Sequence, residues 1–325
     1  MPKLRHPNDD LPRSVAHLTN LRGVGDMIAF TILALGIVLF LPPYLDGIAR
    51  KVKARIQHRR GPPLMQTWYD LVKLLSIPSV IPTRNWLFKL YPYLAFASAI
   101  VAALLLPYGG VIPLKLGYNL IVFFYAILMV SVFLMLAGFS VQNAFSHLGS
   151  AREMMLILTV EPLLAIVYGI LAYNAGSLDI GEIISNLHLT PSLIVAYAIL
   201  AYSMYVESGF VPFDVAEAET EVIGGPLAEY SGRLLGIFYY AIHIKRFALL
   251  WFFVSLVVLP LVPITTQAKA LLALLLQLLL TLALYPVIAS LEATNARLRI
   301  DQVAKVNVRL FFASIIVFAM SFLGW

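Results

Sequence analysis

The stretch MIAFTILALGIVLFLPPYL, residues 27–45, separates Asp26 from Asp46 and contains no charged side chain. Nineteen uncharged residues are long enough to cross the hydrocarbon core of a bilayer as one helix. Similar apolar segments follow at residues 91–107, 118–141, 154–173, 192–211, 233–259, 270–291 and 306–325, with residues 247–268 as an alternative for the sixth span. The sequence therefore predicts an all-α, polytopic membrane protein with about eight transmembrane helices.

The composition supports this fold class. Of the 325 residues, 61% are hydrophobic and 12% are charged, which excludes an ordinary soluble protein. The chain has no cysteine, so disulfides and an iron–sulfur cluster held by its own thiolates are excluded. The six histidines lack the spacing of metal ligands, and we expect no metal site. We expect residues 1–325 to form a single integral membrane domain whose first span is retained rather than cleaved as a signal.

Basic residues are concentrated in alternate connections between the spans. Residues 46–89 carry nine Lys or Arg against two Asp, and residues 291–305 carry Arg297, Arg299 and Lys305. The positive-inside rule places these connections in the cytoplasm and both termini outside, in a multi-pass protein of the cell (plasma) membrane. Four basic residues near the N-terminus oppose this orientation: Lys3, Arg5, Arg13 and Arg22. We interpret the net charge of +6 as orientation and lipid contact, with no nucleic acid as partner.

The cytoplasmic basic segment, residues 46–89, contains one pattern that is not a simple loop. Five apolar side chains recur at helical spacing on one face: Leu64, Trp68, Leu71, Val72 and Leu75. Polar residues lie between them. The spacing predicts a short amphipathic helix at the cytoplasmic interface.

The stretch VESGFVPFDVAEAETEVIGGPLAEYSG, residues 206–232, holds six of the chain's 17 carboxylates and no Lys or Arg. Pro212 and the Gly-Gly-Pro at 224–226 interrupt any long helix, so residues 207–232 are predicted to form a cytoplasmic acidic loop. It is either a solvated surface loop or a site where crowded carboxylates raise one another's pKa and hold protons. In a helix, Asp214, Glu217 and Glu221 would share one face; a fifth helix continued through Pro212 would align Glu207, Asp214 and Glu221 as a ladder.

Ionisable residues inside the predicted spans are candidates for function, because their burial in lipid is costly. Glu161 lies about nine residues into the fourth span and could instead be a packing residue. Glu207 lies near the end of the fifth span, where it could reach water. Lys245 and Arg246 lie about twelve residues along a sixth helix that begins near Arg233, or at the interface if that helix begins later.

Two polar, basic segments offer contacts at the membrane surface. Residues 56–63, IQHRRGPP, could anchor to anionic lipid or pair with carboxylates of a cytoplasmic partner, and residues 293–302, ATNARLRIDQ, form a second such segment. The chain shows no nucleophile with its base, no phosphate-binding glycine loop and no metal motif. We therefore expect no catalytic residue in this chain.

Several motifs in order resemble one known family: RGP at 60–62, GSARE at 149–153, EP at 161–162, PFDVAEAE at 212–219, EYSG at 229–232 and RIDQ at 299–302. Together they resemble the membrane heel of respiratory complex I and its relatives in membrane-bound hydrogenases. The resemblance implies a helical subunit that joins a peripheral redox arm to antiporter-like membrane subunits. It also implies that a NiFe centre and iron–sulfur clusters are held by the NiFe-type large subunit and the iron–sulfur small subunit of that arm, with no cofactor bound by this chain.

The resemblance also assigns roles by position. It implies an ion-coupling path through the acidic loop and the spans: Glu161, Glu207, Asp214, Glu217, Glu219, Glu221, Glu229, Lys245 and His243. It implies docking of the peripheral arm on a set of arginines: Arg59, Arg60, Arg152, Arg297 and Arg299.

The sequence EVIGGPLAEYSG, residues 221–232, and the lysine at position 245 in the next helix resemble members of the group 4 hydrogenase and sulfur-reductase branch more than those of complex I. We therefore predict a non-catalytic, ion-coupling subunit between a ferredoxin-oxidising arm and proton- or sodium-pumping subunits. One alternative is the quinone-binding heel of a complex I-like dehydrogenase that oxidises NADH or a reduced deazaflavin, which would need an apolar chamber beside the amphipathic helix. An autonomous secondary transporter is the alternative of another class, although the sequence lacks the repeat symmetry common there.

Overall fold

The computed structural model describes residues 24–217, 219–262 and 266–323, and the side chains of these residues except those of 24–27, 219 and 220. Within them, seven helices are long and apolar enough to span a bilayer: α2 (Val24–Ile56), α4 (Leu87–Leu104), α5 (Asn119–Phe139), α6 (Ala144–Ala175), α10 (Gly232–Val258), α11 (Gln267–Thr294) and α12 (Ile300–Phe322). A shorter apolar helix, α8 (Pro191–Glu207), lies beside them. The prediction of an all-α membrane protein with about eight spans is confirmed.

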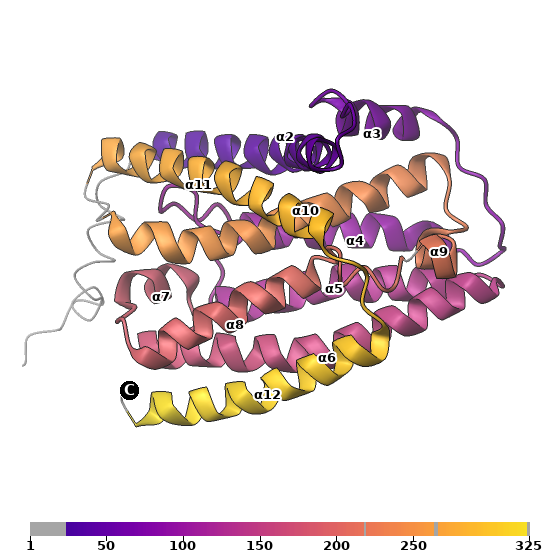
Figure 1. Cartoon of the computed structure of the whole chain (residues 1–325). Helices are drawn as coiled ribbons and strands as arrows, with labels where there is room; N and C mark the ends of the chain where they lie inside the picture. The colour runs from indigo at the N-terminus through magenta and orange to yellow at the C-terminus, as the bar shows by residue number, and fades with distance from the viewer. Residues whose placement is uncertain (1–23, 218, 263–265, 324–325) are drawn as a thin grey trace, which may run out of the picture.

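The long helices lie side by side as one bundle (Figure 1). Helix α10 lies at the centre of the bundle. A larger share of its apolar segment is buried, 67%, than in any other described span. It packs against α2, α4, α5, α8 and α11. Small residues allow the close packing: Ala95, Ala99 and Ala102 are fully buried in α4, which contacts both α5 and α10. Bulky side chains fill the centre, among them Trp251 and Phe252.

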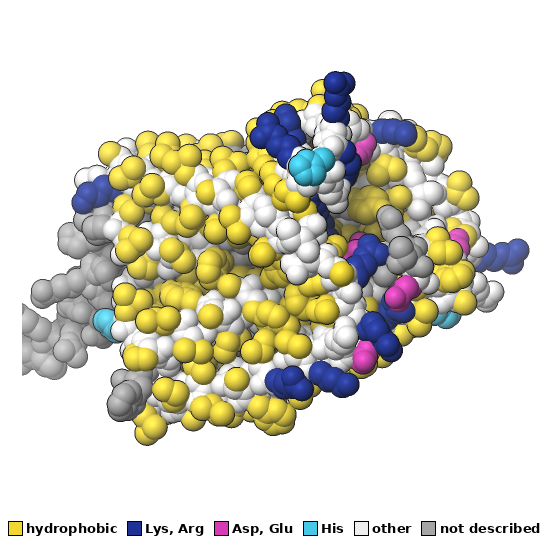
Figure 2. Space-filling model, viewed as in Figure 1, with side chains coloured by type: hydrophobic (Ala, Val, Ile, Leu, Met, Phe, Trp, Pro, Cys, Tyr) yellow, Lys and Arg dark blue, Asp and Glu magenta, His cyan; other side chains and the backbone are white. Residues whose placement is uncertain are grey.

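The two ends of the bundle differ. The amphipathic helix α3 (Gln66–Ser76), the short helix α9 (Glu219–Val222) and the one-turn η1 (Gly225–Leu227) lie at one end, which we call the charged end. At the opposite end lie α7 (Ile180–Asn186), η2 (Leu259–Leu261) and the end of α12. Figure 2 shows most of the visible Lys, Arg, Asp and Glu side chains at the charged end, and a mainly apolar surface over the rest of that face.

Several boundaries differ from those predicted. Helix α2 does not end at Leu45 but continues to Ile56, because Asp46 pairs with Arg50 one turn later at 2.8 Å. Helix α6 begins at Ala144, where the side chain of Asn143 accepts a hydrogen bond from the backbone N–H of Phe145. Helix α12 begins at Ile300 rather than near Val306. Charged residues therefore extend helices beyond the apolar segments.

The predicted amphipathic helix is present as α3. Its inner face packs on α10 and α2. Leu71 is buried, and the ring of Trp68 lies tilted against Phe40 and edge-on to Tyr240, with ring centroids 5.4 and 6.0 Å away. The hydroxyl of Thr67 donates to Asp46 at 2.7 Å, which ties the helix to α2. Val72 departs from the prediction, since its side chain is exposed.

Helix α8 is the feature that positions the site. It begins at Pro191 with Thr190 as N-cap and ends after 17 residues at Glu207, about 25 Å of helix against the ~30 Å of bilayer hydrocarbon. In Figure 1 the chain leaves α8 near the middle of the bundle and returns to α9 at the charged end as a loop. Non-helical backbone at membrane depth requires either enclosure by protein or a wet cavity. Residues 208–209 and 213–217 line such a cavity.

Candidate functional site

An ion pair lies buried at the end of α8. The ammonium of Lys245 on α10 is 2.6 Å from Oε1 of Glu207, and the two side chains are 9% and 4% exposed. Ser131 of α5 completes the group: its hydroxyl donates to Glu207 at 2.9 Å and accepts from Lys245 at 2.5 Å. Two of the alternatives raised from the sequence are therefore wrong. Glu207 does not reach bulk water, and Lys245 does not lie at the interface, because α10 begins at Gly232.

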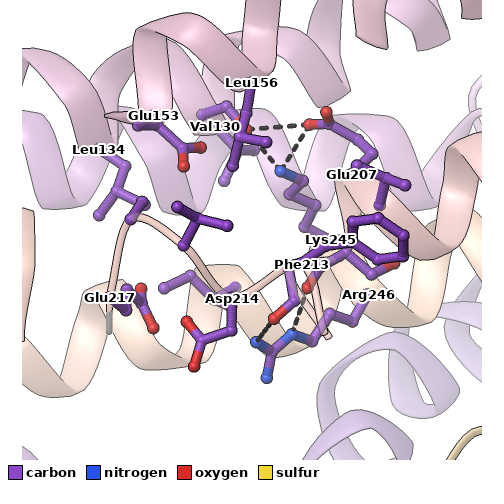
Figure 3. Close-up of a pocket in the computed structure, with 17 residues that line it drawn as sticks. Val130, Leu134, Glu153, Leu156, Glu207, Phe213, Asp214, Glu217, Lys245 and Arg246 are labelled. Carbon is purple, nitrogen blue, oxygen red and sulfur yellow. Dashed lines mark hydrogen bonds and ion pairs between the residues drawn. The ribbon is translucent and has the colours of Figure 1, made fainter. Parts of the chain in front are cut away.

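A cavity of about 50 Å³ adjoins this pair. Helices α5, α6, α8 and α10 and the loop after α8 supply its walls, which include the side chains of Glu153, Glu207, Asp214, Glu217, Lys245 and Arg246 (Figure 3). One water needs roughly 10–15 Å³ of such space, so the cavity has room for a few waters beside many polar partners. We call it the inner cavity.

Arg246 holds the loop in place. Its guanidinium donates to the carbonyl oxygens of Ser208 at 2.8 Å and Gly209 at 3.3 Å, and lies 5.0 Å from the ring centre of Phe210. These bonds satisfy backbone carbonyls that the end of α8 leaves without helical partners. The loop is thereby fixed against α10, with Asp214 and Glu217 at the wall of the inner cavity.

Glu161 of α6 stands apart from the ion pair. It is 8% exposed, and neither of its carboxyl oxygens has a hydrogen-bond partner among the described residues. It interacts electrostatically with Glu207, Lys245 and Glu153, so all four belong to one buried cluster. The helical environment is apolar there, so an unpaired charge on Glu161 would be costly.

Other carboxylates of the acidic loop pair with neighbouring elements. Asp214 lies 2.9 Å from Arg297, and Glu221 lies 2.6 Å from Arg152, whose guanidinium also donates to the carbonyl of Val215. Glu229 accepts a hydrogen bond from the side chain of Asn143. These pairs join the loop to α6 and to the segment before α12. The side chain of Glu219 lies outside those described.

The acidic loop does not form a continuous helix, as its Pro and Gly residues predict. Helix α8 ends at Glu207, and in the described part of the loop only Glu219–Val222 is α-helical, with one 3-10 turn at Gly225–Leu227. Asp214, Glu217 and Glu221 therefore do not share a helix face, and the ladder that a continued helix would give does not form. Gly225 helps set the actual path: its φ is +53°, and a Cβ there would overlap the carbonyl of Ala216. The carboxylates meet through loop packing instead of helix register.

Glu217 is the carboxylate whose protonation is most perturbed outside the spans. Burial, and next the charge of Asp214, raise the pKa of Glu217 from 4.5 to about 7; Arg246, Lys245 and Arg297 act in the opposite direction. Glu217 therefore exchanges a proton near neutral pH, at the wall of the inner cavity.

A larger cavity, about 290 Å³, lies between α2, α3 and α10, and we call it the outer cavity. Its walls are largely charged or polar: Asp46, Arg50, Thr67, Asp70, Glu217, Tyr239, His243 and Arg246, with Leu71, Leu74 and Ile242. Glu217, Ile242 and Arg246 line both cavities, so the two spaces adjoin at these side chains. His243, predicted as part of the ion-coupling path, faces only the outer one, and its Nδ1 has no partner in the described part of the chain.

The arginines predicted to dock a peripheral arm fall into two groups. Arg152 and Arg297 are engaged with carboxylates of this chain. The other three are exposed at the charged end: Arg59 donates to Gln57 at 2.8 Å, Arg60 lies beside it, and Arg299 pairs with Asp301 at 3.3 Å with its side chain 79% exposed.

Sequence reasoning did not select three residues of the site. Glu153 lies in the quoted GSARE motif, and helical spacing of two turns from Glu161 could have placed both on one face. Asp46 was treated only as the end of a span. Ser131 lies within an apolar run and gives no signal, because a lone serine in a membrane helix is common. The described residues contain no group of three or more His, Cys, Asp or Glu arranged to hold a metal.

Comparisons with known proteins agree with this architecture. A family model described as NADH dehydrogenase matches residues 28–323. Formate hydrogenlyase subunit 4 of Escherichia coli (strain K12) is 35% identical over 277 residues, covering 82% of this chain and 89% of that protein. Hydrogenase-4 component C of the same organism is 36% identical over 239 residues, covering 71% and 76%. The H-type membrane component of the NADH-quinone oxidoreductase of Syntrophotalea carbinolica is 29% identical over 230 residues, covering 64% and 69%.

A solved structure shares the fold. A chain of the membrane-bound sulfane sulfur reductase, an archaeal respiratory membrane complex, superposes with a TM-score of 0.77 at 25% identity, covering 91% of this chain and 99% of that one. The resemblance drawn from the sequence motifs is thus confirmed. This chain belongs to the NADH dehydrogenase family, together with membrane subunits of complex I and of group 4 hydrogenases.

Proposed function

We propose that this chain is a non-catalytic, ion-coupling subunit of a membrane oxidoreductase complex. It would link a peripheral, ferredoxin-oxidising arm of the hydrogenase or sulfur-reductase type to antiporter-like subunits that pump protons or sodium. The observation that carries the proposal is the buried Glu207–Lys245 pair at the wall of a carboxylate-lined cavity, which the loop after α8 brings to membrane depth. Burying ionisable groups inside a membrane protein costs free energy, and such groups commonly mark the pathways of ions or protons.

The two cavities support a direction for the path. The outer cavity lies at the charged end, between α2, α3 and α10, and adjoins the inner cavity at Glu217. Because the pKa of Glu217 is about 7, it can both accept and release a proton at neutral pH. Protons set in motion by redox chemistry would enter the outer cavity, pass Glu217, and reach Glu207 through water in the inner cavity.

Partners and cofactors follow from the same proposal. We place the charged end in the cytoplasm of a plasma-membrane complex, with Arg59, Arg60 and Arg299 as contacts for the peripheral arm. The chain has no cysteine, so its residues do not fit an iron–sulfur cluster bound by thiolates. Clusters and a NiFe centre would belong to the large and small subunits of the arm.

The outer cavity also bears on the quinone alternative. An isoprenoid quinone needs a largely apolar chamber, whereas six of the eleven lining residues here are Asp, Glu, Arg or His. This lining favours an ion path over a quinone site. Quinone-site inhibitors should therefore leave turnover of the complex unchanged.

The test compares variants in the intact complex reconstituted in vesicles. Glu207→Gln and Asp214→Asn should leave electron transfer at the peripheral arm running while ion transport into the vesicles falls at least tenfold. Glu182→Gln, which removes a carboxylate on α7 at the opposite end of the bundle, away from both cavities, is the matched control and should transport normally. Normal transport in both site variants would rule out the ion-coupling assignment.

A native-membrane pull-down with mass spectrometry tests the partners. A NiFe-type large subunit with both cysteine pairs, together with antiporter-like subunits, is the expected result for a hydrogenase. A large subunit that lacks part of this cysteine set would indicate sulfur reduction. Recovery of the chain alone, with ion transport by the isolated chain, would favour an autonomous transporter.

A further inference from the structure

The buried cluster contains more carboxyl groups than cations. Lys245 is the cation of the cluster, and it contacts Glu207, while Glu161 is equally buried and has no hydrogen-bond partner among the described residues. An uncompensated charge in such a place is strongly unfavourable. One ammonium can therefore keep only one of these two carboxyls ionised, and the other must hold a proton.

Lys245 is placed to serve either carboxyl. It projects from α10, while Glu207 lies on α8 and Glu161 on α6, and helices α6 and α8 pack directly against each other. Glu161 and Lys245 already interact electrostatically. A lysine is a compact charge on a flexible four-carbon stem, so a change of rotamers moves the ammonium while the helix stays fixed. The other titratable groups facing Glu161 are Glu153 and Tyr168, which cannot supply a positive charge.

We propose that Lys245 alternates between Glu207 and Glu161, and that the proton held by the unpaired carboxyl alternates in the opposite sense. This proposal rests on the ion-coupling function and identifies Lys245 as the side chain that moves during coupling. In the first state, seen here, Lys245 pairs with Glu207 and Glu161 is protonated. In the second, Lys245 pairs with Glu161 and Glu207 is protonated.

The exchange balances in charge and atoms. Glu207 takes up one proton from water of the inner cavity as the ammonium leaves it. Glu161 releases one proton as the ammonium arrives, to a water or carboxylate of the adjoining membrane subunit. Lys245 remains protonated, so the three groups together carry the same net charge in both states. Glu207 lines the inner cavity and Glu161 does not, so the two carboxyls exchange protons with different surroundings.

Ser131 acts as a positioning residue in this exchange. Its hydroxyl contacts both Glu207 and Lys245 in the first state. When the ammonium leaves, the same hydroxyl can still donate to a protonated Glu207 through its carbonyl oxygen. It thus supports Glu207 in both protonation states, as a hydroxyl can donate and accept.

The decisive experiment is the structure of the complex carrying Glu207→Gln, which keeps the shape of the side chain and removes its charge. We expect the ammonium of Lys245 to lie within ion-pair distance, about 4 Å, of Glu161. Glu153→Gln is the matched control, because it removes a neighbouring carboxylate and should leave Lys245 on Glu207. If Lys245 stays beside Ser131 in the Glu207→Gln structure and Glu161 keeps no partner, the exchange does not occur.

Infrared spectroscopy reports how many carboxyl groups are protonated, and it does not require the Glu207→Gln complex to assemble. In Glu161→Gln, the C=O band of protonated carboxyls should lose the intensity of one carboxyl, because the protonated Glu161 is absent. In Lys245→Met, the band should gain the intensity of one carboxyl, because Glu207 takes up a proton when its cation is removed. An unchanged band in both variants would contradict the proposal. Neither measurement depends on transport. If Glu207→Gln and Asp214→Asn both lose transport but Lys245 does not relocate, the exchange alone is refuted. If Lys245 relocates and both variants transport normally, the ion-coupling function is refuted.

Discussion

Replacing Glu217 by glutamine should change how the stability of this protein depends on pH. Burial and the neighbouring Asp214 raise the pKa of Glu217 from 4.5 to about 7, so the folded chain favours its neutral form. The stabilisation this gives is complete below pH 4.5 and is lost as the pH rises through 7. Glu217→Gln cannot ionise and avoids that loss.

The size of the effect follows from the same shift. A change of about 2.5 pH units at 1.36 kcal/mol per unit is about 3.4 kcal/mol, an upper limit. The side chain is partly exposed along the cavities, and screening by water reduces the figure to about 2 kcal/mol. Relative to wild type, the variant should therefore gain about 2 kcal/mol of stability between pH 5 and pH 8.

The assay is thermal unfolding of the detergent-solubilised complex at half-unit pH steps, comparing each variant with wild type. Taking the difference removes the contributions of all other titrating groups. Asp301→Asn is the control: its carboxylate pairs with Arg299 in solvent, and its difference curve should stay within about 1 kcal/mol at every pH. Parallel curves for Glu217→Gln and wild type would refute the claim that Glu217 changes protonation near neutral pH.

Lys245→Met leaves two buried carboxyls without their cation and should cost about 3–5 kcal/mol at neutral pH, seen as a lower unfolding temperature. Glu207→Gln should cost clearly less, because Lys245 can pair with Glu161; equal losses would argue against this asymmetry. Gly225→Ala places a Cβ against a backbone carbonyl at positive φ and should impair assembly of the acidic loop, measured as faster proteolysis at the charged end. Gly36→Ala, with no atom within 4 Å of its Cβ, is the control and should behave as wild type.

The sequence predicted the spans well because bilayer thickness and hydropathy set their number and approximate place. The predicted boundaries differ from the structure at the helix ends, because polar contacts determine where each helix begins and ends. The pair formed by Asp46 and Arg50 extends α2 past the apolar segment, and the Asn143 cap starts α6 before its apolar part. Neither contact follows from periodicity, because each depends on which side chain finds a local partner.

The candidate site was identified by residue type and resemblance, while its geometry was not. Glu161, Glu207 and Lys245 were singled out because ionisable groups are rare in spans. That Glu207 pairs directly with Lys245 while Ser131 contacts both depends on three helices distant in sequence, which no local pattern specifies. The ladder that a continued helix would give does not form, because α8 ends before Pro212 and packing of the loop against α6 and α10 replaces helical register.

The early end of α8 has an electrical consequence. Water that enters from the charged end and fills the inner cavity would bring the potential of the solvent phase to the depth of Glu207, so that the membrane voltage would fall mainly across the protein beyond it. Moving one elementary charge through the full voltage involves about 2.3 kcal/mol per 100 mV. Because the layer of protein without water is thinner, the same energy change occurs over a shorter distance. The end of α8 at Glu207 therefore concentrates the electric field on the protein between Glu207 and the opposite end of the bundle, and small displacements of charge there become sensitive to the energised state of the membrane.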